Sequence, residues 1–497
     1  MPPCPGQRPG WFAALTMVAA TGAATLACGN GTSAANTPPA RTLRVGVSLG
    51  VNSLASQTNG VRQIAQNITA EGLGRVAEDG KLEPQLADNW SLRDNGRELL
   101  IRLKPAVKFQ DASSADARAI ASLLPAAIRN LAGSIADDIQ SIEPIDPSTL
   151  AMRFRRPEPL LTETLEVMIR KEEGGASTGA FMTSPTSPTE LVANPSYHLG
   201  RPQLTRIEIK AFPSVRSAWA ELLRNNIDML YEVGSDALDS LEGATNVAVF
   251  TFTRRYQYAV VLNNQSPALK SKSVRRALNM AVDRTQLVRD ALNGHGLPSS
   301  GPVWPKHWAI AGAAQAPEFN PALAAKLLKG QSLRFTCLMA SDPLYERIGL
   351  ELKRQLAAFG VDMELKSMPP DALYQAQRIH EYDAALTELI SGPTFLRLYG
   401  MWHSQGAFNY SGRGNATIDS ALDGMRNATS DQQYKQAAPL VAAAFDDDPG
   451  AIFLAWSERA RAVSRRFAVP PPEPGSDVLR TLRLWTPRND QRFASRN

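Results

Sequence analysis

The sequence predicts a mixed α/β protein in which some strands pair in parallel. Short runs with an apolar residue at every second position alternate with stretches in which apolar residues recur at helical spacing. One stretch, residues 332–365, has a strand pattern, a capped helix and a second strand pattern in direct succession, and such a βαβ unit implies parallel pairing. The chain has 497 residues, 43% of them apolar, so it can bury a large core and divide into two or three domains.

The early strands are predicted from two-residue periodicity. Residues 41–48 (RTLRVGVS) place three apolar side chains on one side, and Asn95-Gly96 predicts a turn into the next strand because both residue types accept positive φ. Alternation also predicts strands at residues 150–154, which Pro157 ends, and at residues 206–212 (RIEIKAF).

The βαβ unit is the clearest element. LRFTCLMA (residues 333–340) is a strand pattern, after which Asp342 is placed to cap a helix that has Pro343 at its first position. Gly360 stands where a helix end favours glycine, and residues 361–365 alternate as the next strand. The helix carries one apolar stripe, formed by Leu344, Ile348, Leu352 and Leu356.

Two proline-rich loops interrupt these patterns. They are residues 182–190 (MTSPTSPTE) and residues 469–476 (VPPPEPGS). The second loop is followed by residues 477–485 (DVLRTLRLW), for which we expect a strand that returns to a domain begun much earlier in the chain.

The amino-terminal region predicts export. Residues 1–27 have a positive start, an uncharged apolar run from Trp11 and small residues at the end, which is the pattern of a secretory signal peptide rather than of a buried helix. Leu26-Ala27-Cys28-Gly29 resembles the lipobox of bacterial lipoproteins, although Thr25 stands where leucine is usual. We favour lipidation of Cys28, because residues 28–40 read as a flexible polar tether. Ordinary cleavage after Ala27 or after Ala35 remains the alternative.

Composition excludes several other classes. The cysteines of the mature chain would be Cys28 and Cys337, since Cys4 leaves with the leader. If Cys28 is lipidated, no internal disulfide is expected. The net charge is +5, from 53 basic and 48 acidic residues that alternate without a basic block, so nucleic-acid binding is not expected. No stretch after the leader is expected to span a membrane.

Several further stretches, in chain order, carry a family resemblance. They are residues 71–111, STGAF (177–181), residues 191–212, LLRNNIDMLYEV (222–233), residues 273–303 with their SVRRALNMAVDR core, PALAAKLLKG (321–330), the βαβ unit and residues 409–425. Together they resemble the family 5 solute-binding proteins of ABC importers, which include oligopeptide, dipeptide and nickel binders. The resemblance covers residues 41–485. Ala106 and Ala112 depart from it, because the family usually has glycine there.

The resemblance implies a type II periplasmic-binding-protein fold with two lobes and an extra subdomain in the first. Lobe 1 would hold residues 41–255, lobe 2 residues 256–469, and residues 470–497 would form a proline linker and a return to lobe 1. Hinge crossings would lie near residues 256–263 and 470–475. The protein would be a monomer without cofactor or metal, and would deliver a peptide or peptide-like solute to an ABC permease and ATPase complex. A binding lipoprotein that serves a sensor is the alternative.

The resemblance also implies where the solute binds. In peptide-binding relatives an aspartate pairs with the amino group of the peptide, and its place here falls at or beside Leu389, so Glu388 is the nearest acid. Because neighbouring residues of a strand face opposite ways, Glu388 faces either the cleft or away from it. We expect binding mainly through backbone and aromatic contacts, without the free amine as chief anchor. The candidate ligand-binding residues are Asn52, Ser53, Leu54, Tyr256, Glu388, Ser391, Gly392 and Trp402.

A serine hydrolase is the rival interpretation. Gly175-Ala176-Ser177-Thr178-Gly179 matches G-x-S-x-G, and five histidines could complete a triad: His198, His295, His307, His380 and His403. However, charged residues precede the motif and prolines follow it, whereas the hydrolase motif needs a strand before the serine and a helix after it. We therefore expect no catalytic residues. The acidic run 446–448 is expected to be a solvated helix end rather than a cation site.

Overall fold

The computed structural model describes residues 41–48, 64–65, 68–172, 175–234, 237–238, 241, 243–299, 301–310, 319–410 and 414–488. The predicted leader, the tether with Cys28, and the candidate residues Asn52, Ser53 and Leu54 lie outside these ranges. Everything below concerns the described part of the chain.

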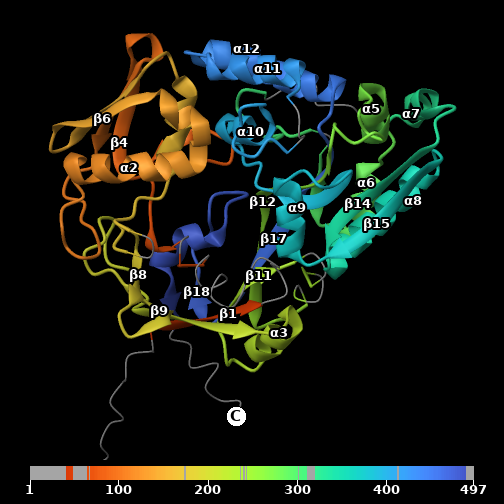
Figure 1. Ribbon diagram of the computed structural model, residues 1–497. Helices are drawn as coiled ribbons and strands as arrows, with labels where there is room; N and C mark the ends of the chain where they lie inside the picture. The colour runs from red at the N-terminus through yellow and green to blue at the C-terminus, as the bar shows by residue number, and fades with distance from the viewer. Residues whose placement is uncertain are drawn as a thin grey trace, which may run out of the picture. The chain divides into compact units, whose positions relative to one another are not determined.

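One large sheet contains eleven of the described strands (Figure 1). Its strands, in order across the sheet, are β15 (Val361–Met368), β14 (Leu333–Ala340), β16 (Ala384–Leu389), β12 (Val247–Leu262), β17 (Ala451–Ser464), β11 (Met229–Val233), β1 (Thr42–Ser48), β10 (Arg206–Phe212), β9 (Ser187–Ala193) and β8 (Phe181–Ser184), with β13 (Gly296–Pro298) paired to β17. The two longest strands, β12 and β17, pair antiparallel at the centre of this order. They therefore connect the strands on one side of the sheet with those on the other.

The predicted parallel pairing is confirmed. β14 pairs in parallel with both β15 and β16, and β1 with β10 and β11. Between β14 and β15 runs α8 (Pro343–Ala357), in which the Asp342 side chain accepts a hydrogen bond from the Leu344 N–H, 2.8 Å away. Gly360 has φ +76°, as its place after the helix required. The buried stripe of α8 includes Ile348, Leu352 and Leu356.

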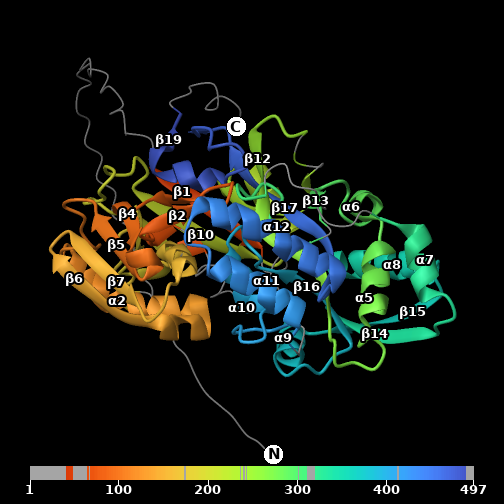
Figure 2. The same ribbon diagram turned by 90° about the horizontal axis from the view of Figure 1, so that it is seen from above.

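A second sheet has four strands and one covering helix. The strands are β4 (Ala87–Arg93), β5 (Glu98–Leu103), β7 (Thr149–Phe154) and β6 (Ile139–Asp146), all antiparallel to their neighbours. The turn at Asn95-Gly96 has positive φ at both residues, as predicted. In Figure 2 this sheet and α2 (Ala117–Ala132) lie on the left, β14 and β15 lie on the right, and β12 and β17 lie between them.

The sequence predicted no membrane-spanning stretch after the leader, but α2 bears on that expectation. Together with η2 (Gly133–Asp138), it forms the one described helical stretch that is long and apolar enough to cross a membrane by length and composition. However, its apolar residues Ile120, Leu124 and Ile128 are buried in the same core cluster as Leu99 and Ile101 of β5. We therefore interpret α2 as a core helix.

The remaining helices cover the large sheet and connect it to the small one. They are α3 (Val215–Leu223), α5 (Lys272–Met280), α6 (Arg284–Ala291), α7 (Pro321–Leu328), α9 (Pro370–Arg378), α10 (Phe395–Trp402), α11 (Ala416–Arg426) and α12 (Asp431–Asp447), with the 3₁₀ segments η1 (Asp94–Gly96) and η3 (Pro159–Glu166). Helices α11 and α12 lie side by side, at the top of Figure 1. One core cluster contains residues of the small sheet, α2 and η3 together with residues of α10, α11 and α12.

The expected strand at residues 477–485 is wrong. Val478–Leu484 forms a 3₁₀ helix, η4, because the Asp477 side chain accepts a hydrogen bond from the Leu479 N–H and so favours a helical turn. Strand pairing follows only at β19 (Thr486–Pro487), against β18 (Phe467–Ala468). The apolar residues Val478, Leu482 and Trp485 share a core cluster with residues of β1 and β10.

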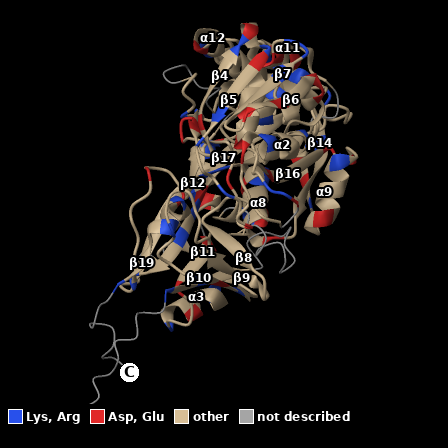
Figure 3. Ribbon diagram, turned by 90° about the vertical axis from the view of Figure 1, so that its left-hand side faces the viewer, with Lys and Arg blue, Asp and Glu red and all other residues tan. Residues whose placement is uncertain are grey.

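Charged residues are dispersed over the fold. Figure 3 shows basic and acidic positions interspersed on the helices and strands of this view. The acidic run at the end of α12 is used in ion pairs, because Lys272 contacts Asp447 and Arg275 contacts Asp448. This run therefore joins α12 to α5.

Candidate functional site

A bulge in β12 is the structural centre of the candidate site. Pairing with β17 holds Thr253 opposite Glu458 and resumes with Gln257 opposite Trp456, so residues 254–256 stand against a single residue of β17. The backbone of the bulge is fixed from the other side, because the Gly392 N–H donates to the Arg255 carbonyl at 3.0 Å. Bulges release side chains from the regular alternation of a strand. Here the bulge in β12 places Arg254, Arg255 and Tyr256 on the lining of a cavity.

This cavity, which we call the cleft, has a volume of about 700 Å³. Segments far apart in the sequence form its walls: β2 (Gly74–Val76) with the residues before it, the turn at Gly179, the end of β11, the bulge, Trp304, and η4 with the loop before it. Aromatic side chains on the wall are Phe181, Tyr197, Tyr231, Phe252, Tyr256 and Trp304. Such a mixture of aromatic and charged groups suits a small solute with polar ends.

A network of buried ion pairs forms one wall of the cleft. Glu232 of β11 lies 3.2 Å from Arg254 and 3.0 Å from Arg459. Burial would raise the pKa of Glu232, but the guanidinium groups of Arg254, Arg459 and Arg461 outweigh it, and the pKa is lowered. The Arg254 guanidinium also lies 3.8 Å from the centre of the Tyr256 ring. This wall is therefore held rigidly by charge pairing.

Arg255 differs from its neighbour Arg254 in its partners. Its guanidinium donates to the carbonyl oxygens of Val76 and Ala77, at 2.6 and 2.8 Å, and no described carboxylate forms an ion pair with it. Burial, and next the charge of Arg480, lower the pKa of Arg255 to about 10. It therefore stays protonated at neutral pH.

The lining of the cleft also contains Glu71, which is buried. Its carboxylate accepts a hydrogen bond from the Tyr197 hydroxyl at 2.7 Å and lies 3.1 Å from His198 Nε2. Burial, together with the Glu71 charge, raises the pKa of Tyr197. Because these groups satisfy Glu71, it is not an open acid site.

The candidate residues from the sequence analysis lie in three different environments. Tyr256 lines the cleft. Glu388 pairs across strands with Tyr258 and contacts Arg459 and Arg254, at 3.2 and 3.8 Å, and its side chain is 11% exposed. It belongs to the buried ion-pair network.

Three further candidates lie outside the lining of the cleft. Ser391 is buried, with its hydroxyl 3.4 Å from Gln257 Oε1, and Gly392 has φ +57° behind the bulge. Trp402 is buried between Phe445 and Phe453 in the core. Whether any of these residues contacts a solute stays a prediction.

Sequence reasoning missed the arginines of the cleft. Arg255, Arg461 and Arg480 all line it. One local signal was present: residues 254–258 (RRYQY) place two charges and two aromatics next to an apolar strand end. Charged residues directly beside the apolar part of a strand would have indicated that a polar cavity lies there.

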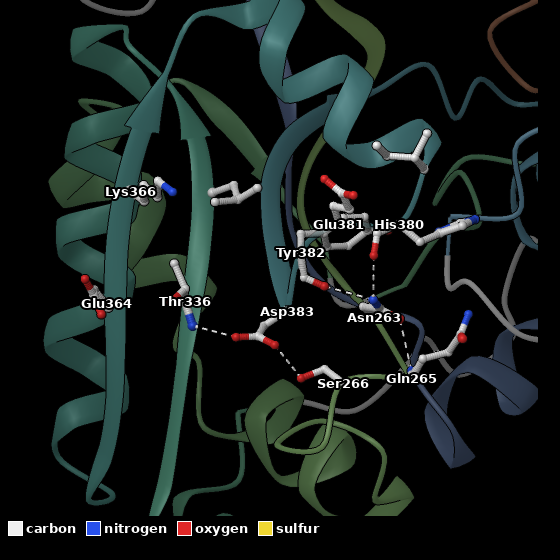
Figure 4. A pocket seen from close by; sticks show the side chains of 12 residues that line it. Asn263, Gln265, Ser266, Thr336, Glu364, Lys366, His380, Glu381, Tyr382 and Asp383 are labelled. Atoms are coloured by element: carbon white, nitrogen blue, oxygen red, sulfur yellow. Dashed lines mark hydrogen bonds between the residues drawn. The ribbon is translucent and has the colours of Figure 1, made fainter.

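A second cavity, of about 720 Å³, lies where β12 ends and β16 begins, beside the middle of β14 and β15 (Figure 4). Its polar groups bind one another: Asp383 accepts hydrogen bonds from the Ser266 hydroxyl and the Thr336 N–H, and Asn263 donates to the carbonyls of His380 and Tyr382. These bonds join strand ends, so we favour the cleft as the functional site.

The serine of the G-x-S-x-G motif does not lie in a hydrolase arrangement. Ser177 is fully buried, its hydroxyl donates to the Ile169 carbonyl, and its N–H donates to Gln110. The segment after it is β8, not a helix. Within the described ranges, no group of three metal-binding side chains is present.

Comparison with known proteins gives the family. The family model for bacterial extracellular solute-binding proteins, family 5 Middle, matches residues 81–409. The chain is 24% identical over 417 residues to the probable D,D-dipeptide-binding periplasmic protein DdpA of Escherichia coli, covering 75% of this chain and 79% of that protein. It is 23% identical to the oligopeptide-binding protein AppA of Bacillus subtilis, over 60% of this chain and 59% of AppA.

Solved structures share the fold. NikZ from Campylobacter jejuni, in complex with Ni(L-His), superposes with a TM-score of 0.74 at 20% identity, covering 90% of this chain and all of that one. AppA from Bacillus subtilis, in complex with a nonapeptide, gives 0.72 at 21% identity and covers 90% of this chain and 99% of AppA.

The chain therefore belongs to the family 5 bacterial extracellular solute-binding proteins and has the type II periplasmic-binding-protein fold. This confirms the resemblance that the sequence motifs indicated. Its function is that of the solute-binding component of an ABC-type importer.

Proposed function

We propose that this protein captures a peptide or peptide-like small solute in the cleft and delivers it to an ABC permease and ATPase complex. The observation that carries the proposal is the position of the cleft. It lies at the bulge of β12, where the pairing of the two strands that connect both sides of the large sheet is interrupted. Names of the relatives support the solute class, since they include D,D-dipeptide-, oligopeptide- and glutathione-binding proteins.

A thermal-shift screen tests the solute class. A ligand that binds only the folded protein raises the melting temperature by mass action, by an amount that grows with its concentration. The screen would contain di- and oligopeptides, nickel complexes and small oligosaccharides. We expect peptides to give the largest shifts. A shift given only by oligosaccharides would contradict the proposal.

We further propose two lobes, residues 41–255 and 256–469, with residues 470–497 returning to the first. The register shift of β12 at residues 253–257 supports a hinge there, because the ladder is interrupted at that point. The packing of Val478 and Trp485 with Leu43 supports the return of the tail. Small-angle scattering with and without solute would detect closure as a smaller radius of gyration.

For the contacts to the solute, we propose Asn52, Ser53 and Leu54 on one wall and the bulge on the other, with backbone and aromatic contacts dominant. Glu388 would not anchor a peptide amine, since Arg459 and Arg254 already pair with it. We expect a peptide and its amino-acetylated form to bind with similar affinity. A large loss on acetylation that Glu388→Gln reproduces would show that the carboxylate is the anchor.

We propose binding without turnover. The buried hydroxyl of Ser177, bonded to a backbone carbonyl, supports this, because a nucleophile must reach its substrate. No ester or amide hydrolysis is expected from the purified protein. Hydrolysis that Ser177→Ala abolishes would favour the enzyme.

Finally, we propose export as a monomer with a lipid anchor at Cys28. Membership of an extracellular family supports export. Cys28→Ser should release the protein from the membrane fraction, and labelled fatty acid should enter only the wild type. A wild type that never incorporates the label would support ordinary cleavage. Permease and ATPase genes beside this one would favour the importer over a sensor.

A further inference from the structure

Three arginines form a row on one wall of the cleft. They are Arg75 of β2, Arg480 of η4 and Arg255 of the β12 bulge, and we call them the arginine row. The row is compact, because Arg255 and Arg480 donate to the same oxygen, the Val76 carbonyl, at 2.6 and 3.1 Å. Two guanidinium groups thus lie side by side at the edge of the cleft.

The row has few counter-charges. Arg75 and Arg480 share Glu473, whose side chain is 58% exposed, and Arg75 also pairs with Glu83. Arg255 has no ion pair with a carboxylate of the described residues; its bonds go to backbone carbonyls.

The acids of the cleft form ion pairs or hydrogen bonds with other residues, so they offset the charge of the row only in part: Glu166 and Glu78 act on Arg255, but Glu166 acts less strongly than Arg480 does. Each of the five has a partner of its own: Glu71 with His198, Glu78 with Lys306, Glu166 with Arg397, Glu232 with Arg254 and Arg459, and Asp477 with Arg461. Eight basic and five acidic residues of the described chain line the cleft, so its lining has an excess of positive charge, to which the row contributes three arginines.

Like charges at this spacing raise the free energy of the empty cleft. Burial lowers the pKa of Arg480, and the neighbouring charge of Arg75 lowers it further; Arg255 is affected by Arg480 in the same way. An anionic group placed between the guanidinium groups would relieve this repulsion and accept charge-assisted hydrogen bonds in a partly desolvated place.

We propose that the arginine row binds an anionic oxygen group of the solute, a carboxylate or a phosphate. This inference rests on the proposed function and specifies what the site recognises: a solute that presents a carboxylate or a phosphate to the row. The charged end of the solute lies against Arg255 and Arg480, and the aromatic side chains of the cleft contact its remaining part.

Isothermal titration calorimetry at low salt tests the proposal with three matched probes. They are a panel of dipeptides with free carboxyl termini, the same dipeptides as carboxamides, and the carboxamides carrying one phosphoserine. We expect each free acid to bind at least roughly tenfold more tightly than its amide, the order of magnitude of one charge-assisted hydrogen bond. Restored affinity with phosphoserine would indicate a phosphate ligand, and no restoration a carboxylate.

Variants then assign the effect to the row. Arg255→Gln and, separately, Arg480→Gln should reduce the ratio of acid to amide affinity toward one. The control is Arg354→Gln on α8, which removes an arginine with a 56% exposed side chain outside the cleft and should preserve the ratio. Two variants are used because Arg255 also holds backbone carbonyls, and circular dichroism reports whether each has folded.

The outcomes separate this inference from the proposed function. If acids and amides bind the wild type equally, or both row variants keep the wild-type ratio, the arginine row does not bind an anion and the inference is overturned while solute capture stands. If no member of the panel binds in any form, peptide capture itself is refuted, and the inference with it.

Discussion

Glu163 should make the stability of this protein depend on pH. It lies in η3, where its carboxylate accepts hydrogen bonds from the Tyr434 hydroxyl at 2.6 Å and the Leu396 N–H at 2.7 Å, and no described cation forms an ion pair with it. Burial raises its pKa from 4.5 to about 7. Both partners belong to the helical region α10–α12, so this carboxyl joins η3 to those helices.

The sign of the effect follows from proton binding. Between pH 4.5 and 7 the folded protein holds a proton on Glu163 that the unfolded chain has lost. The free energy of unfolding therefore falls as the pH rises through this window, and the contribution is fully lost above pH 7. At about 1.4 kcal/mol for each pKa unit, the shift from 4.5 to about 7 corresponds to a loss of about 3.5 kcal/mol.

Glu163→Gln isolates this contribution. Glutamine has the shape of the protonated acid, so the variant should match the wild type near pH 4.5 and exceed its unfolding free energy by about 3 to 3.5 kcal/mol at pH 8. Urea unfolding followed by circular dichroism at several pH values measures the difference. Glu364→Gln, at an exposed position of β15, is the control. A difference between wild type and Glu163→Gln that is the same at pH 4.5 and 8 would refute the reasoning.

Three further predictions concern stability. Ala106→Gly and Ala112→Gly should each raise the unfolding free energy by about 0.5 to 1 kcal/mol, because both alanines have positive φ, 58° and 66°; unchanged urea midpoints would contradict this. Arg426→Ala should cost about 3 to 5 kcal/mol in urea unfolding, since the fully buried Glu158 carboxylate loses its nearer cation, at 2.6 Å, and keeps only the more exposed Arg156, at 3.7 Å, and Glu158→Leu in the same chain should recover part of the loss. Gly179→Ala should lower the melting temperature, at a cost of about 1 to 3 kcal/mol, because its Cβ would lie 2.3 Å from the Thr69 carbonyl carbon; an unchanged melting temperature would contradict the close packing.

The elements that could be predicted from the sequence are those fixed by local chemistry. Asp342, Pro343 and Gly360 determine where α8 begins and ends through caps and backbone preferences within a few residues, so the βαβ unit was predicted correctly. The sequence also showed that Ala106 and Ala112 stand where the family usually has glycine. Both positions have the positive φ that favours glycine. Residues 477–485 were mispredicted as a strand because the capping role of Asp477 was not considered.

The candidate site could be predicted only in part, because it depends on pairing between distant segments. The bulge that presents Arg255 exists only in relation to the register of β17, about 200 residues further along the chain. Arg480 reaches Val76 only because the tail packs beside β2. The face of Glu388 was undecidable from one strand alone, and its pairing with Tyr258 in the structure places it in the ion-pair network.

The interrupted ladder of β12 has a mechanical consequence. A sheet resists bending through its hydrogen bonds, so its compliance is concentrated where residues 254–256 have no regular partners on β17. If the sheet bends there, displacement grows with distance from that axis, and the edge strand β15 moves farther than β16, which is paired directly to β12. A pair of spectroscopic labels on β15 and β10 would therefore report small rotations that labels beside the bulge would miss.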